Sequence, residues 1–345
     1  MNALVAQPEL RARAGLGDLP ARLRERPCTI AYLGASVTAQ KDGYRPRLHA
    51  LLSQATGHEH RAVAAGFGAM GSITGRFLME RFVMPHEPEL AFVEYVTSDV
   101  AGTTPPELLR AALEGIVGRL REAGCEPCFL YLPRRDLDPR SSPVLEAYED
   151  VAAYHGVPSI DLSAVSTEGP DPLLRDLVHT SDAGSALLAG AVARAFAELT
   201  PGPTPERLPL RESVLQHARI VTPTPALLRD GSRCETGSFR LVFPFVEIDS
   251  DNELEFIPEG DLAGLLVAVG PRSGYIELEA AGRRREYLLW DEWCSYERLS
   301  SVVFWPFAPA GMPVTLRVLD RPIERSDGLG PGGRRLKVLG LMERV

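Results

Sequence analysis

Ser36, Asp176 and His179 are of the residue types that together attack a carbonyl group and move a proton. Ser36 lies in the stretch GASVT, directly after an apolar run, and Asp176 stands three residues before His179 in DLVH. A serine hydroxyl is a weak nucleophile until a base removes its proton, and imidazole does this near neutral pH. A carboxylate on the other ring nitrogen orients the imidazole and stabilises its charged form. These residues therefore predict nucleophilic attack by Ser36 on an acyl group.

Two further polar stretches offer hydrogen-bond donors for the oxyanion of such a reaction. In the glycine-rich run GFGAMGS, the backbone N–H group of Gly68 or of Ala69 is a candidate, together with that of Ser36. In TSD, Ser98 and Asp99 are candidate oxyanion or substrate-binding residues. An ordinary polar turn explains Ser98 and Asp99 equally well, so both interpretations stay open.

The catalytic candidates also have ordinary structural explanations. A serine between a strand and a helix is a common N-cap, so Ser36 alone is weak evidence. Asp176 is also near the helical run that begins DAGSALLAG, but Asp182 is better placed to cap that helix. Because this leaves Asp176 and His179 without a capping role, we interpret them as partners of Ser36.

Two other motifs have residue types that bind ligands. Arg134 and Arg135 in LPRRD follow an apolar run and suit an anionic substrate group, although exposed charge is the simpler explanation. Cys125 and Cys128 in CEPC have a redox or zinc spacing. No second pair follows, and the pair runs into an apolar strand, so we interpret these thiols as packing residues and predict no metal site.

The elements that must position these residues form a regular alternation from residue 29 to about residue 200. Apolar runs such as TIAYLG, HRAVAAG, ELAFVEYV, CFLYLP and VPSIDLS are separated by longer helical stretches. Such repeats predict a parallel sheet covered by helices on both faces, the α/β class. Ligands bind at the carboxyl ends of the strands in such sheets. The polar stretches described above are therefore expected to meet at one sheet edge.

The periodicity divides the chain into parts. The expected parts are a leading helix over 1–27, an α/β domain over 28–200, a proline-rich linker over 201–209 and a β domain over 210–345. Short strand-like runs separated by turns make the last part mostly β, a sandwich or jelly-roll.

The β domain also contains all three tryptophans, Trp290, Trp293 and Trp305. Aromatic rings stack on sugar rings, so a carbohydrate-binding surface is one interpretation. Core packing is the interpretation that we favour.

Composition excludes several classes of protein. The 345 residues carry a formal net charge of -9, which argues against nucleic acid or an anionic membrane as a partner. The N-terminal segment lacks the apolar core of a signal peptide, and no stretch is long and apolar enough to cross a membrane. Five cysteines do not form a disulfide framework in a chain of this length. We therefore expect a cytoplasmic protein.

The order and spacing of GASVT, the glycine-rich turn, VEYVTSD and DLVH resemble the sequence blocks of the SGNH (GDSL-type) hydrolases, over about residues 28–200. The resemblance implies a flavodoxin-like three-layer α/β/α fold, with Ser36 as nucleophile, His179 as base and Asp176 as its orienter. It further implies hydrolysis or transfer of acyl groups, commonly acetyl groups on carbohydrates, without a metal or other cofactor.

Two positions depart from the family pattern. The third block of the family places an asparagine, an oxyanion donor, where this chain has Ser98. The catalytic glycine of the second block matches either Gly68 or Ala69, depending on register. Loss of one oxyanion donor typically costs a factor of about 10² to 10³ in rate.

The sequence thus predicts a serine esterase that acts on an O-acetylated carbohydrate or another small acyl ester. An acyltransferase with the same catalytic residues is an alternative, because water and an alcohol attack the same acyl-serine. A scaffold that keeps the fold but has lost efficient catalysis is another, motivated by Ser98. Whether the chain forms a homo-oligomer is left open.

Overall fold

The computed structural model divides the chain into two compact units, Met1–Gln216 and His217–Val345. Each unit has its own hydrophobic core. The structure describes residues 8–102, 104–138, 141–165, 173–202, 206–211, 215–223, 235–239, 243–323 and 334–345.

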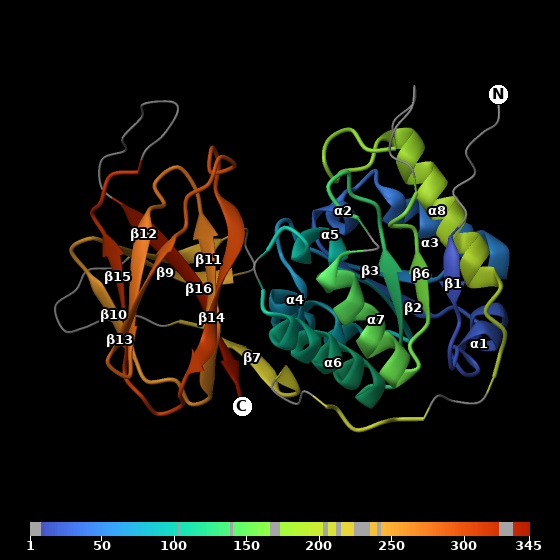
Figure 1. Cartoon of the computed structure of the whole chain (residues 1–345), viewed down its shortest axis with the longest axis horizontal. Helices are drawn as coiled ribbons and strands as arrows, with labels where there is room; N and C mark the ends of the chain where they lie inside the picture. The colour runs from blue at the N-terminus through green and yellow to red at the C-terminus, as the bar shows by residue number, and fades with distance from the viewer. Residues whose placement is uncertain are drawn as a thin grey trace. The chain divides into compact units, whose positions relative to one another are not determined.

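A mixed sheet forms the centre of the first unit (Figure 1). Within the described residues its strand order is β1-β6-β5-β4-β2-β3, in which β2 to β6 are parallel and β1 pairs antiparallel with β6. The central strands are buried on both faces, as their continuous apolar runs require. The strands are β1 (Glu9–Arg11), β2 (Thr29–Gly34), β3 (Arg61–Gly66), β4 (Leu90–Glu94), β5 (Glu126–Tyr131) and β6 (Ser159–Asp161).

Helices cover both faces of this sheet, so the predicted three-layer α/β fold is confirmed. On one face lie α1 (Leu19–Glu25), α3 (Tyr44–Thr56) and α8 (Asp182–Ala197). On the other lie α4 (Ser72–Phe82), α6 (Pro106–Glu122) and α7 (Pro143–His155). Two four-residue helices, α2 (Ser36–Ala39) and α5 (Val96–Asp99), directly follow strands, and a short 3-10 turn, η1 (Met84–His86), precedes β4.

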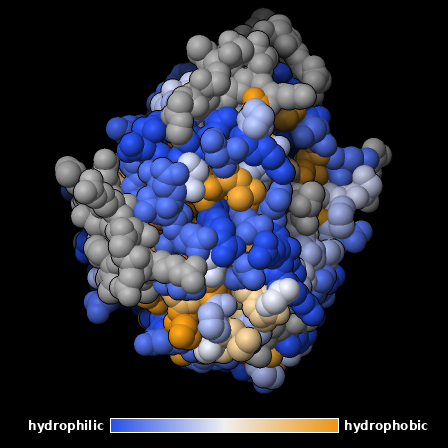
Figure 2. Space-filling model, turned by 90° about the vertical axis from the view of Figure 1, so that its left-hand side faces the viewer, coloured by the Kyte–Doolittle hydropathy of each residue, from blue (hydrophilic) through white to orange (hydrophobic). Residues whose placement is uncertain are grey.

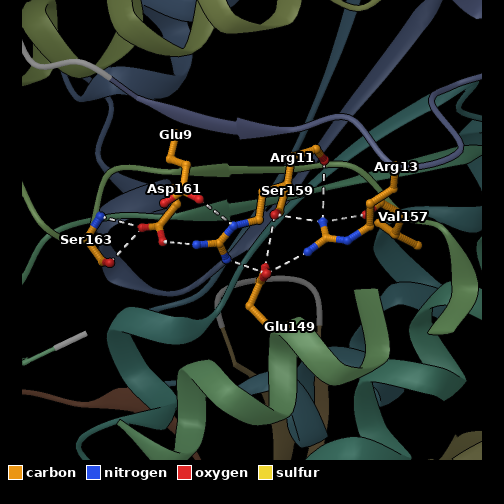
Figure 3. A network of polar contacts seen from close by, with 8 residues as sticks. All are labelled: Glu9, Arg11, Arg13, Glu149, Val157, Ser159, Asp161 and Ser163. Atoms are coloured by element: carbon orange, nitrogen blue, oxygen red, sulfur yellow. Dashed lines mark hydrogen bonds and ion pairs between the residues drawn. The ribbon is translucent and has the colours of Figure 1, made fainter. Parts of the chain in front are cut away.

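A polar network holds the N-terminal strand β1 against the rest of the sheet (Figure 3). Arg13 donates to the carbonyl of Val157 at 2.9 Å, and its guanidinium pairs with Glu149 at 2.6 Å. Arg11 also pairs with Glu149. The leading helix that we predicted over 1–27 lies partly outside the described residues. Within residues 8–27 the chain forms strand β1 followed by the shorter helix α1, because contacts with β6 and α7 extend the first segment.

The first unit extends beyond the linker that we predicted over 201–209. Arg211 donates through its backbone N–H to Glu114 at 2.6 Å, and its guanidinium donates to the same carboxylate at 2.8 Å. The buried Arg76 donates to the carbonyl of Leu215 at 3.0 Å and to that of Gln216 at 2.5 Å. These bonds attach the segment to α4 and α6, and the division between the units therefore falls after residue 216.

The second unit is a sandwich of antiparallel sheets, as the sequence predicted. One sheet has the order β10-β15-β12-β13, and the other has the order β14-β11-β16-β9-β8, with β7 paired to β16. Side chains from both sheets form one core. The described strands are β7 (Ala218–Val221), β8 (Glu235–Phe239), β9 (Phe243–Asp249), β10 (Glu253–Phe256), β11 (Asp261–Val269), β12 (Tyr275–Ala280), β13 (Arg283–Leu288), β14 (Arg298–Ala308), β15 (Val314–Leu319) and β16 (Arg335–Arg344).

The tryptophans do not all belong to this core. Trp290 packs against it, whereas Trp293 is 65% exposed and Trp305 is 36% exposed. Core packing therefore explains only Trp290, and the favoured interpretation is wrong for the other two. One face of the molecule shows hydrophobic patches within a largely hydrophilic surface (Figure 2).

The thiols of Cys125 and Cys128 are free and buried. Burial raises the pKa of both thiols well above the usual range, which disfavours the reactive thiolate.

Among the described residues, no helix is long and apolar enough to cross a membrane.

Candidate active site

The turns that carry the predicted site residues begin at the same level of the sheet. Gly34 at the end of β2 pairs with Gly66 at the end of β3 and with Glu94 at the end of β4. The chain moves to one side of β2 to form β3 and to the other side to form β4, which makes β2 a topological switch point. Such a point is where open α/β sheets bind ligands.

Ser36 is the first residue of α2 and not its N-cap. The N-cap is Ala35, which has an extended backbone and provides no side-chain bond to the helix. The Ser36 hydroxyl instead lies 2.9 Å from Nε2 of His179. The capping explanation for Ser36 is therefore wrong.

The structure brings Ser36, His179 and Asp176 into one chain of hydrogen bonds. The Nδ1 atom of His179 lies 2.8 Å from Oδ2 of Asp176, and the other ring nitrogen faces the serine. A carboxylate at Nδ1 favours the tautomer that carries a proton there, which leaves the Nε2 lone pair free to accept the serine proton. This geometry is that of a nucleophile, its base and an orienting acid.

Asp176 is fixed by its own loop. Its Oδ1 atom accepts bonds from the backbone N–H groups of Val178 at 2.9 Å and His179 at 2.8 Å. Desolvation opposes the charged form, but these bonds and the imidazole outweigh it and lower the pKa of Asp176 below the usual value. Asp176 is therefore ionised at neutral pH, as an acid that stabilises an imidazolium must be.

Two neighbouring segments hold the histidine loop in place. The loop closes on itself through a bridge between Leu174 and Thr180. Thr180 donates to the side chain of Gln40, just after α2, at 3.2 Å. Arg135 donates through its guanidinium to the carbonyl of Leu174 at 2.7 Å and through its backbone N–H to that of Leu177 at 3.1 Å. The loop is thus tied to the nucleophile turn and to the segment after β5.

Two of the sequence interpretations near this loop need correction. The N-cap of α8 is Ser181, whose hydroxyl accepts from the N–H of Gly184, and Asp182 is the first helical residue. Arg134 is buried, pairs with Asp136 at 2.7 Å and donates to the carbonyl of Thr97 at 2.5 Å, so neither exposed charge nor substrate binding describes it.

The turn after β3 leaves Gly68 and Ala69 exposed near the start of α4. Neither of their N–H groups, nor that of Ser36, donates a hydrogen bond to any residue that the structure describes. All three therefore remain candidate oxyanion donors. Ala69 has φ of 59°, in the left-handed region that favours glycine.

Replacing Ala69 by glycine is expected to raise the free energy of unfolding by up to about 1 kcal/mol. The left-handed backbone costs an L-residue about 1 to 2 kcal/mol, and the greater freedom of glycine in the unfolded chain offsets part of this gain. Chemical denaturation measures the change. Ala55→Gly, at an exposed position in α3, is the matched control and should destabilise by about 1 kcal/mol. Destabilisation by both substitutions would contradict the expectation.

The carboxylate of Asp99 is bonded to groups of α4 and α7. It is buried, its Oδ1 accepts from the N–H of Ser72 at 3.0 Å, and its Oδ2 accepts from Tyr148 at 2.7 Å. A Cβ atom on Gly71 would lie only 2.2 Å from this carboxylate, so glycine is required there. We therefore correct the predicted role of Asp99 to that of an anchor between α5 and the first turn of α4. Ser98, one residue earlier, is half-buried.

Sequence reasoning missed Glu94, a buried carboxyl group at the end of β4. It accepts bonds from the hydroxyls of Thr38 at 2.9 Å and Thr97 at 2.5 Å. The signal that points to it is an acidic residue at the end of an otherwise apolar strand, in the stretch LAFVE. Buried charge of this kind is costly and therefore informative.

The two buried carboxyl groups are expected to make the fold less stable as the pH rises. Desolvation, only partly offset by hydrogen bonds, raises the pKa of Glu94 from 4.5 to about 7 and that of Asp99 from 3.8 to about 6. Between the unfolded and folded values the native state holds more protons than the unfolded state, so the free energy of unfolding falls with increasing pH.

Glu94→Gln isolates one of these groups. From pH 4.5 to pH 7 the wild type should lose on the order of 3 kcal/mol relative to this variant. Urea denaturation at several pH values measures the difference. Parallel stability curves for the two proteins would count against a raised pKa for Glu94.

An open α/β sheet with a hydrogen-bonded serine, histidine and aspartate at its carboxyl edge has the geometry that nucleophilic attack by a serine requires. Residues 30–187 match the protein-family model described as the GDSL-like lipase/acylhydrolase family. The match lies within the first unit, which is therefore similar to that family over those residues.

Two similar solved structures extend over both units. One is a two-domain esterase (CEX) active on acetylated mannans, co-crystallised with mannopentaose; it has a TM-score of 0.76 and 13% sequence identity, over 94% of this chain and 93% of that chain. The other, of a two-domain esterase (CEX) active on acetylated mannans, has a TM-score of 0.73 and 13% identity, over 94% of each chain. At this identity the likeness shows the fold. No match was found among curated proteins.

Proposed function

We propose that the protein is a serine esterase that removes acyl groups, acetyl above all, from a carbohydrate through an acyl-Ser36 intermediate. The observation that carries this proposal is the chain of hydrogen bonds from Ser36 through His179 to Asp176, at 2.9 and 2.8 Å. The family of the domain is consistent with ester hydrolysis. The activity of the similar esterase on acetylated mannans suggests the class of substrate.

The proposed reaction begins when Oγ of Ser36 attacks the acyl carbon while its proton passes to Nε2 of His179. The resulting oxyanion is held by N–H donors, for which Ser36, Gly68 and Ala69 are the candidates. Collapse of the intermediate breaks the ester bond, and the leaving alcohol takes the proton from His179. Asp176 keeps the imidazolium oriented and stabilised throughout.

Water then completes the proposed cycle. It attacks the acyl-Ser36 carbonyl and gives a proton to His179; the second intermediate collapses to a carboxylic acid, and Ser36 recovers its proton. The side chain of His179 is 30% exposed and that of Asp176 is 51% exposed, so solvent has access to the base. This exposure favours hydrolysis over the alternative, acyl transfer, because a transferase must keep water from its intermediate.

The experiment that tests the proposal combines labelling with product analysis. A fluorophosphonate should label the wild-type protein at Ser36, as mapped by peptide mass spectrometry, and acetate should be released from p-nitrophenyl acetate and acetylated manno-oligosaccharides. Adding a non-acetylated oligosaccharide in excess tests transfer, because a transferase would form a new acetylated product. Absence of both labelling and acetate release would favour the scaffold alternative.

A further inference from the structure

The buried side chain of Glu94 connects two turns of the candidate site, α2 and α5. Its Oε2 atom accepts from the hydroxyl of Thr38 in α2, at 2.9 Å. Its Oε1 atom accepts from the hydroxyl of Thr97 in α5, at 2.5 Å, and from the N–H of the same residue, at 3.3 Å. Thr38 lies two residues after Ser36, and Thr97 lies one residue before Ser98. One side chain thus contacts both the nucleophile turn and the turn of the candidate donor Ser98.

These two turns need such a connection because they are short. Helices α2 and α5 have four residues each, and the N-cap residue of neither helix provides a side-chain bond. An isolated helix of this length is unstable in water, so tertiary contacts must set the backbone of both turns. The contacts around Thr38 are close: its hydroxyl is 2.9 Å from that of Tyr44, and a Cβ atom on Gly34 would lie 2.2 Å from it.

Burial of a carboxyl group at this position is energetically unfavourable. Burying it costs free energy that an apolar side chain would not, and its hydrogen bonds come from hydroxyl and amide groups. No arginine, lysine or histidine pairs with Glu94 among the described residues, so an ion pair does not account for it. What the carboxyl group adds is two acceptor atoms that point to two different turns.

We propose that Glu94 is a positioning residue, which holds the Ser36 turn and the Ser98 turn in a fixed relation through Thr38 and Thr97. This inference rests on the proposed function, since it assigns Glu94 to the same reaction. It does not place Glu94 in contact with substrate. The amide of Glu94→Gln can keep the bonds, with its oxygen accepting from Thr97 and its nitrogen donating to Thr38.

The test compares variants that break or preserve the connection. Glu94→Leu and Thr97→Val break it, Glu94→Gln preserves it, and Thr56→Val is a matched control that loses a hydroxyl bond to His60 at the end of α3. Melting temperatures identify a temperature at which every variant is folded. The kcat and KM for p-nitrophenyl acetate, together with hydrogen exchange of peptides that cover α2 and α5, are then measured at that temperature.

We expect Glu94→Leu and Thr97→Val to lower kcat by about 10- to 100-fold with KM within threefold of the wild type, since small displacements of catalytic groups have effects of this size. Exchange in both peptides should accelerate about tenfold. Glu94→Gln should stay within about threefold of the wild-type kcat, and Thr56→Val should change neither quantity. Unchanged exchange in α2 and α5, or an equal fall of kcat in Thr56→Val, would overturn the inference. A wild type that is not labelled at Ser36 would count against the proposed function, whereas the exchange measurements would still decide the role of Glu94.

Discussion

Ser36→Ala and His179→Ala are each expected to lower kcat for ester hydrolysis by a factor of about 10⁴ or more, and the double variant is expected to lower it no further. The reason is the contact of 2.9 Å between the serine hydroxyl and Nε2 of His179. If this contact transfers the proton, loss of either partner removes the same step, so the two effects do not add.

The measurement is steady-state hydrolysis of p-nitrophenyl acetate, with fluorophosphonate labelling as a second readout. Asp176→Asn should also lower kcat strongly, because a neutral amide cannot stabilise the imidazolium and its nitrogen cannot accept a hydrogen bond from Nδ1 of His179. His86→Ala, at a half-buried histidine outside the site, is the control and should leave kcat unchanged. Independent effects that multiply in the double variant would show that the two residues do not act as a unit.

The sequence allowed the main elements of the first unit to be predicted because their signals are local. Mainly apolar runs mark the buried strands β2, β4 and β5, and each is followed by a polar turn. The meeting of these turns follows from the parallel arrangement alone. Ser36 and His179, which are 143 positions apart, could therefore be paired before their contact was known.

Other features depend on contacts that no local pattern records. The strand β1 has three residues, and its partner β6 lies about 150 positions away, so nothing in its own sequence marks it as a strand. Asp99 and Ser98 are adjacent, but α5 is helical, and consecutive helical residues point about 100° apart. The helical backbone therefore points the side chain of Asp99 into the interior and leaves that of Ser98 half-buried. From the residue types alone, Ser98 and Asp99 were equally good candidates for the site.

The N-cap of α8, which is Ser181 and not Asp182, also depends on contacts outside the helix. Both residue types are good N-caps, and a shift of one position decides which side chain reaches the N–H groups of the first turn. The position is set by the loop before it, where the N–H of Ser181 donates to the carbonyl of Leu173 at 2.9 Å. That loop also carries His179, so the site and the start of the helix are fixed together.

Ser98→Asn is expected to raise kcat by a factor of about 10², in the direction opposite to most substitutions in an active site. Removing one side-chain donor from an oxyanion hole typically costs a factor of about 10² to 10³, and asparagine reaches further than serine with an N–H donor. The backbone at this position is held firmly: Thr97 is bonded to Glu94 and to Arg134, and Asp99 is bonded to Tyr148. A longer side chain at position 98 should therefore extend from a fixed base.

Ser98→Asp is the matched control for this prediction, because aspartate has nearly the shape of asparagine but, when ionised, only accepts hydrogen bonds. A negative charge beside a developing oxyanion should lower kcat, so the two variants are expected to differ by more than about 10²-fold in opposite directions. The KM should change little in Ser98→Asn, since the added bond strengthens as the oxyanion forms. Equal rates for Ser98→Asn and Ser98→Asp, at equal melting temperatures, would mean that position 98 does not face the oxyanion. The N–H groups of Ser36, Gly68 and Ala69 would then have to supply the donors alone, and Ala69, with its left-handed backbone, would be the next position to test.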